Sequence, residues 1–250
     1  MFFSYINNVS RFFQYDYVYI DAFFLLIWLV ILFWQKKYKA LLFGLVIVPI
    51  IYIIDAFVWW NSFSGGHYIR EYWINGMALP HPLGQNFWLK FKLDFMMTIS
   101  YALFTFPWLW LTFEALRNGK VRQIFKFSAI WLGFWLAVPL LSFYLNIDNR
   151  AVESVRHMAS QNYIWLINFI VGFGFLAILY RKELLLVGKI FVIGVVGGLI
   201  MELPLFIFNI RPTQPGVLIF DAIFMLNQGV PYLFILFDKV FFRQRKQVLW

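Results

Sequence analysis

Four acidic side chains lie inside or at the edge of apolar segments of this sequence, and they are its strongest candidates for chemistry. They are Asp55, Asp94, Glu202 and Asp221. A charge in an apolar membrane segment is unfavourable by about 2.5–3.5 kcal/mol on insertion scales, so such residues usually mark function. A pair of carboxyl groups can act as proton donor and proton acceptor, and we predict that these four residues are catalytic.

A structural role is the alternative for some of these acids. Asp94 and Asp221, together with Asp21, stand where predicted helices begin. A carboxylate at that position can simply cap the helix. Asp55 and Glu202 are not at a predicted helix start, so capping does not explain them.

Aromatic and amide side chains provide candidate substrate contacts. Trp59 and Trp60 follow Asp55 by about one helical turn, and the face of an aromatic ring can stabilise a cation. Amide side chains inside apolar spans can bind a polar group or join two helices through a hydrogen bond. The predicted substrate-binding residues are Trp59, Trp60, Asn168 and Asn227.

No cofactor and no metal are predicted. The sequence has no cysteine, which excludes a disulfide framework, a thiolate zinc site and a cysteine nucleophile. It also lacks Walker, GxGxxG, GxSxG and DDxxD motifs. The histidines (His67, His81 and His157) fall in predicted outer loops without metal-ligand spacing. The loop at 61–73 is predicted to be a lid or an aromatic belt at the membrane surface.

The elements that must position these residues are membrane helices. Apolar residues make up 62% of the 250-residue chain and charged residues only 13%, against about 45–50% and about 25% in a soluble domain. A spanning helix needs roughly 20 mostly apolar residues. We predict an all-α polytopic protein of the cell membrane with seven transmembrane helices: 18–34, 40–60, 94–113, 127–146, 163–180, 186–208 and 217–238. Gly194 and Gly198 in the sixth helix predict a close contact between helices.

Basic residues predict the orientation of these helices. Fourteen Lys and Arg residues fall on one side of the seven spans and seven on the other. Because short cytoplasmic loops carry the excess of positive charge, the N-terminus is predicted outside and the C-terminus inside. The net charge of +9 then reflects topology and contact with membrane lipid, and no nucleic-acid partner is expected. No particular oligomeric state is predicted.

An internal repeat organises the chain, which we predict to be a single membrane domain over residues 1–250. Residues 17–116 and 160–240 align as two three-helix units, with residues 124–146 as a linker helix. In this alignment Asp55 meets Glu202, and a second acid and a proline follow in the same order in both units. One linker helix gives both units the same orientation, so the prediction is a 3+1+3 parallel repeat.

The order of these features resembles a known family. In the first unit an acid near the end of the second helix is followed by an aromatic loop, by an acid that opens the third helix, and by Phe106-Pro107-Trp108. The second unit repeats the order with Glu202, Asp221 and Val230-Pro231-Tyr232. This pattern resembles the integral-membrane lycopene cyclases of the two-subunit bacterial and archaeal type and their fused fungal relatives.

The resemblance implies repeated three-helix units and a carotenoid-like substrate. In those cyclases the acids that open the third helix fall in a Pro-x-Glu-Glu/Asp motif. Here the segments read Lys92-Leu93-Asp94-Phe95 and Ile219-Phe220-Asp221-Ala222, without the proline or the second acid. The helix arrangement also resembles that of SWEET-type sugar transporters, whose proline-glutamine signature is absent.

These features predict a non-redox membrane cyclase or isomerase that acts on a long isoprenoid or carotenoid-like lipid. A protonated carboxylic acid would add a proton to an alkene, aromatic faces would hold the carbocation, and a second carboxylate would remove a proton. The alternative is a small transporter that uses the outer acids for a cation or a polar substrate. A non-catalytic membrane subunit or receptor is a third hypothesis.

The predicted orientation can be tested by cysteine labelling, since the chain has no native cysteine. A Ser64→Cys variant should react with an impermeant maleimide added outside intact cells, because residue 64 lies in a predicted outer loop. An Arg181→Cys variant, in a predicted cytoplasmic loop, should react only after the cells are opened. Labelling of Ser64→Cys from the cytoplasm alone would contradict the orientation.

Overall fold

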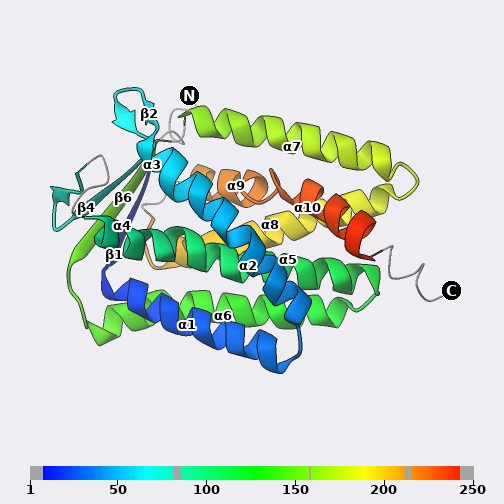
Figure 1. Cartoon of the computed structure of the whole chain (residues 1–250), viewed down its shortest axis with the longest axis horizontal. Coiled ribbons are helices and arrows are strands. Elements are labelled where there is room, and N and C mark those ends of the chain that lie inside the picture. The colour runs from blue at the N-terminus through cyan, green and yellow to red at the C-terminus, as the bar shows by residue number, and fades with distance from the viewer. Residues whose placement is uncertain (1–7, 81–85, 158, 212–214, 243–250) are drawn as a thin grey trace.

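The computed structural model describes residues 8–80, 86–157, 159–211 and 215–242 (Figure 1). Six of its helices are long and apolar enough to cross a membrane. Four of these spans are continuous: α1 (Asp16–Trp34), α6 (Val121–Leu145), α7 (Ala159–Leu179) and α8 (Leu184–Ile207). The six helices confirm the prediction of a helical, multi-pass membrane protein.

The other two spans each contain a π-helical turn beside a predicted catalytic acid. One runs through α2 (Tyr38–Tyr52), η2 (Ile53–Val58) and α3 (Trp59–Asn61). The other runs through α4 (Phe87–Asp94), η3 (Phe95–Ser100) and α5 (Tyr101–Arg117). Asp55 lies within η2, and Asp94 directly precedes η3. A π-helical turn adds a residue to a helix and redirects nearby side chains, which is why such turns are frequent at functional sites.

The seventh predicted span, 217–238, is broken in the middle. A turn at residues 225–229 separates α9 (Pro215–Phe224) from α10 (Val230–Leu236), and η4 (Phe237–Phe242) continues α10. Gly229 and Pro231 explain the break, because glycine weakens a helix and proline disfavours helical geometry in the residue before it. α9 lies towards one end of the bundle and α10 towards the other (Figure 1), and a seventh crossing stays a prediction.

A four-stranded antiparallel sheet closes one end of the bundle, which we call the sheet end (Figure 1). Its strands, in spatial order, are β1 (Asn8–Gln14), β6 (Ala151–His157), β4 (Arg70–Ile74) and β5 (Met77–Ala78). A separate hairpin joins β2 (Phe63–Ser64) to β3 (His67–Tyr68). The turns that join α1 to α2, α5 to α6 and α7 to α8 lie at the opposite end (Figure 1).

The all-α prediction missed this sheet. Its three longer strands come from distant parts of the chain, and β6 pairs on one side with β1 and on the other with β4. A strand of five to seven residues carries a weak local signal, and nothing in one segment shows which distant segment pairs with it. The alternation in β6, where Val152, Ser154 and Arg156 are buried, is the visible trace of its two faces.

Aromatic packing fills the centre of the bundle, while aliphatic and further aromatic side chains cover its outside. Trp108 and Trp131 are fully buried with ring centroids 5.2 Å apart. Trp28 is also fully buried and donates a hydrogen bond to the Leu103 carbonyl at 3.1 Å. Large apolar side chains such as Leu42 and Ile167 are exposed on α2 and α7. Such a surface suits lipid, because soluble proteins rarely expose large continuous apolar areas.

The predicted close contact at Gly194 and Gly198 is confirmed. A Cβ atom at Gly198 would lie 2.6 Å from the backbone oxygen of Ala222 in α9, and one at Gly194 would collide with the Asn227 side chain. Small residues therefore let α8 approach the broken seventh segment closely.

Substitution of these glycines should test that packing. Gly198→Ala should lower the stability of the detergent-solubilised protein by about 1–3 kcal/mol, the usual effect of overpacking. Gly188→Ala is the matched control, because it lies in the same helix with no atom within 4 Å of a Cβ placed there. Thermal unfolding should show a lower midpoint for the first variant only; equal midpoints would contradict the packing.

Candidate functional site

The first two predicted catalytic acids meet at one arginine from the sheet. The Arg70 Nη2 atom in β4 donates to Asp55 Oδ1 at 2.5 Å, and its Nη1 lies 4.0 Å from Asp94 Oδ1. Lys90 forms an ion pair with Asp94 and donates to the Ala56 carbonyl at 2.8 Å. Burial alone would lower the pKa of Arg70, but the charges of Asp55 and Asp94 raise it above its ordinary value.

Aromatic rings surround this group. The Tyr72 hydroxyl donates to Asp94 Oδ1 at 3.0 Å, and burial first, then the Asp94 charge, raises the pKa of Tyr72 well above its ordinary value. Trp60 stacks on Tyr72 with centroids 5.4 Å apart, and Lys90 Nζ lies 4.6 Å from the Trp60 ring centroid. Trp60 therefore stands beside the acids, whereas its neighbour Trp59 is half-buried and makes no described contact with them; substrate binding by either residue stays a prediction.

The other two predicted acids meet in the same way. Arg211, which follows α8, has its Nη1 2.6 Å from Glu202 Oε2 and also contacts Asp221 Oδ2. Arg11 in β1 reaches Glu202 Oε1 from the other side at 3.3 Å. The charges of Glu202 and Asp221 raise the pKa of Arg211 against the opposing effect of its burial.

The two groups are built alike. Each group joins an acid on one helix to an arginine that follows that helix, and the same arginine lies beside an acid near the start of the next apolar segment. These residues are Asp55, Arg70 and Asp94 in one group, and Glu202, Arg211 and Asp221 in the other. This likeness rests on charged residues, and not on the apolar residues that align easily by chance between the two predicted repeat units. The 3+1+3 repeat nevertheless stays a prediction.

Arg156 lies between the two groups and adds an excess of positive charge. It is 7% exposed, its Nη2 is buried without a hydrogen-bond partner, and it forms no ion pair within the part of the chain that the structure describes. Burial, and then the nearby guanidinium groups of Arg11, Arg211 and Arg70, lower its pKa to about 10. The buried cations (Arg11, Arg70, Lys90, Arg156 and Arg211) thus outnumber the four acids.

Asn168 and Asn227 lie away from these groups. The Asn227 amide donates to the carbonyls of Phe191 and Ile223 at 3.3 and 2.8 Å. Asn168 accepts, through its backbone carbonyl, a hydrogen bond from the Tyr232 hydroxyl at 3.1 Å. The Asn227 side chain thus joins its segment to α8, which is the alternative that the sequence left open, whereas the Asn168 contact uses only the backbone. The predicted substrate contacts of both residues stay untested.

Two further acids on α1 are buried without a cation. Asp21 accepts a hydrogen bond from Ser100 Oγ at 2.9 Å, and Asp16 contacts Ser142 Oγ. Both are 0% exposed, and among the described residues neither forms an ion pair. Capping does not explain Asp21, because it lies in the second turn of α1.

A cavity of about 500 Å³ opens at the sheet end near Asp16 and Asp21, although neither acid is among its lining residues. Six of its fifteen lining residues are aromatic, namely Phe12, Phe13, Tyr17, Trp73, Phe143 and Phe208, and the wall also contains the polar residues Gln14, Ser142, Asn149 and Glu153. Ser142, the partner of Asp16, belongs to the wall, as does Tyr17, which stands one helical turn before Asp21. The size lies in the range of about 300–1,000 Å³ that is common for small-molecule sites.

Sequence reasoning found the acids but missed their partners. In the sequence these partners appear only as basic residues on the predicted outer side: Arg11, Arg70, Lys90, Arg156 and Arg211. A useful signal was available in the order of residues, because an arginine follows the acid in both repeat units, at Arg70 and at Arg211.

Comparison of the chain with protein families, curated proteins and solved structures gives no match. The resemblance to membrane lycopene cyclases is therefore untested. The functional interpretation depends on the site itself.

Removal of one arginine should unfold the sheet end. Arg211→Gln leaves Glu202 and Asp221 buried without their shared cation, and loss of one partner of a buried pair typically destabilises by about 3–5 kcal/mol. Arg150→Gln is the matched control, because its side chain is 41% exposed and pairs with Asp148 outside the bundle; exposed pairs contribute about 0–1 kcal/mol. Similar thermal midpoints for the two variants would argue against a tightly coupled network.

Proposed function

We propose that this chain is a membrane cyclase or isomerase that acts on a long isoprenoid lipid. In this proposal it crosses the cell membrane seven times, with the N-terminus outside, so that the sheet end faces outward. The observation that carries the proposal is the aromatic cavity beside two buried acids that have no counter-ion in the described structure.

The cavity suits part of an apolar chain. Its aromatic wall supplies the burial that an isoprenoid gains on leaving water or lipid headgroups. Phe12 and Phe143 line it and are also exposed on the surface. A lipid could therefore enter from the membrane side without first crossing the aqueous phase.

The two acids on α1 suit proton transfer. A buried carboxyl group without a cation is less costly to bury in its neutral, protonated form, and alkene protonation requires that form. In the proposed reaction the proton adds to one alkene carbon, a second alkene attacks the resulting carbocation and closes a ring, and a carboxylate removes a proton from a neighbouring carbon. The molecular formula is unchanged, so no redox partner is needed.

Aromatic faces near Asp21 support the cationic stage. Tyr17 and Tyr101 both lie within electrostatic reach of Asp21, and Tyr101 packs on Trp135 with centroids 4.4 Å apart. Such π faces stabilise a positive charge by about 0.5–2 kcal/mol each, as the Tyr101 ring already does for the Arg11 guanidinium, which lies 5.2 Å from its centroid.

The four acids predicted from the sequence suit this chemistry less well. Each has a guanidinium or ammonium group beside it, whereas the proposed chemistry needs an acid that is not already held in an ion pair. In the proposal, Asp55, Asp94, Glu202 and Asp221 maintain the shape of the site, while Asp21 and Asp16 exchange protons.

Identification of the lipid that copurifies, by mass spectrometry, is the first test. With that lipid as substrate, Asp21→Asn or Asp16→Asn should reduce turnover by about 10²–10⁴-fold, the usual contribution of a general acid or base. Both variants should keep the wild-type thermal midpoint within a few degrees. Glu183→Gln, at the opposite end of the bundle, is the control and should keep full turnover. Full turnover in both aspartate variants would refute the proposal.

A carrier for a polar substrate with an anionic group is the second candidate. Arg156 favours it, because this buried guanidinium, which forms no ion pair among the described residues, would attract a negative charge. The predicted cation substrate fits less well, since arginine and lysine already occupy the acids. Uptake of an anionic solute by proteoliposomes that Arg156→Gln abolishes would favour the carrier over the cyclase.

A further inference from the structure

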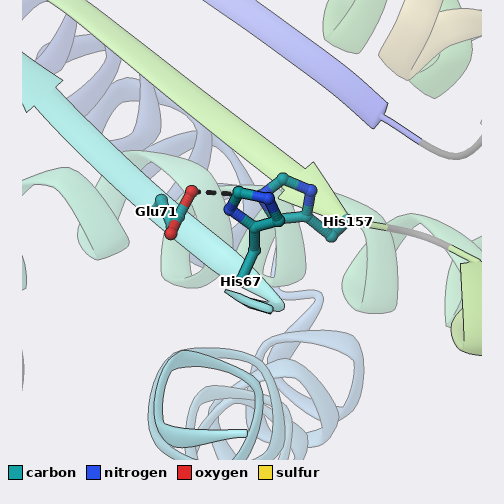
Figure 2. A group of neighbouring side chains, drawn as sticks. All are labelled: His67, Glu71 and His157. Atoms are coloured by element: carbon teal, nitrogen blue, oxygen red, sulfur yellow. Dashed lines mark hydrogen bonds and ion pairs between the residues drawn. The ribbon is translucent and has the colours of Figure 1, made fainter. Parts of the chain in front are cut away.

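Three side chains that could hold a metal ion meet on the strands of the sheet end. His67, Glu71 and His157 each offer one ligand atom, and these atoms all lie within 4.8 Å of one another. Figure 2 shows the three side chains gathered together, with Glu71 joined to the His157 ring. The His157 Nε2 atom lies 3.0 Å from Glu71 Oε2, and the two imidazole rings stack with centroids 4.6 Å apart.

The backbone around these residues is tied together by strand pairing. His67 belongs to β3, Glu71 to β4 and His157 to the end of β6. β4 and β6 are paired in register, and the His157 amide donates to the Ile69 carbonyl at 2.8 Å. Ligands held on paired strands are positioned more accurately than ligands on loops. Glu71 and His157 are separated by 86 positions in the sequence, so the spacing of these residues does not indicate a metal site.

The donor set has a definite metal preference. Two imidazoles and one carboxylate form the three-residue set that zinc accepts with a fourth position left for water or another ligand. Ligand atoms on a tetrahedral zinc lie about 3.4 Å apart, given bonds of about 2.1 Å. His67 is exposed, so its ring can turn to close that distance without moving packed neighbours. Glu71 and His157 are half-buried and already in contact.

We infer that His67, Glu71 and His157 bind a divalent transition metal ion of the zinc type. The ion would hold the β2–β3 hairpin against β4 and β6. Its ligands Glu71 and His157 directly follow Arg70 and Arg156, which are paired in register, so the ion would lie near the group of Asp55, Arg70 and Asp94. The site is independent of the proposed cyclase reaction. His81, the remaining histidine, lies outside the described residues.

The test uses the full chain in detergent, stripped with a chelator and freed of any affinity tag. Titration with zinc chloride, followed by calorimetry and by metal analysis after gel filtration, should give about one ion per chain. Zinc should also raise the thermal midpoint, because a ligand that binds only the folded state stabilises it. A wild-type protein that retains no zinc, or gains no stability from it, would overturn the inference.

Variants then locate the ion. His67→Ala and Glu71→Gln should each weaken binding at least tenfold and remove the zinc-dependent rise in midpoint. His67→Ala is the decisive variant, because an exposed side chain can be truncated with little effect on folding. Asp148→Asn, an acid near the sheet that pairs with Arg150, is the control and should bind zinc as the wild type does. Unchanged binding in both cluster variants would show that zinc binds elsewhere and would refute the site.

Discussion

One kind of interaction governs the sheet end: Asp55, Asp94, Glu202 and Asp221, buried among apolar helices, each lie beside a buried cation. Transfer of a carboxylate into a poorly polarisable interior is unfavourable by several kcal/mol, and only a close, well-oriented partner offsets much of that. The helices bring Asp55 and Glu202, and the strands bring Arg70 and Arg11. Sheet and bundle therefore carry opposite members of the same ion pairs, so each depends on the other for its stability.

This pairing also separates two kinds of acid. The acids held by arginine or lysine fix the geometry, and the π-helical turns at Asp55 and Asp94 orient two of them. The side chains of Asp16 and Asp21 are held only by serine hydroxyls among the described residues. The proposed chemistry uses the second kind, next to the aromatic cavity, and leaves the first as a rigid support.

Hydropathy predicted six of the spans and the acids within them, because both are properties of a single segment. The sheet could not be predicted in this way, since β6 pairs with strands from two distant regions. The cationic partners of the acids could not be predicted for a related reason: the sequence shows that a basic residue lies near the end of a span, but not that its side chain is buried against an acid. Of the seven basic residues assigned to the outer side, Arg11, Arg70, Lys90, Arg156 and Arg211 are buried. Surface charge on that side is therefore lower than the count suggested, and the orientation stays a prediction.

The position of β1 has a consequence for the order of assembly during synthesis. Asp55, Arg70 and Asp94 lie within 40 residues of one another in the sequence, so their group can form as soon as the third span emerges. Arg11 must wait for Glu202, which is 191 positions later, and β1 must wait for β6. Contacts between such distant residues form slowly. The first strand is thus a late closing element, and a chaperone or a lipid that shields Arg11 in the nascent chain would act before Glu202 is made.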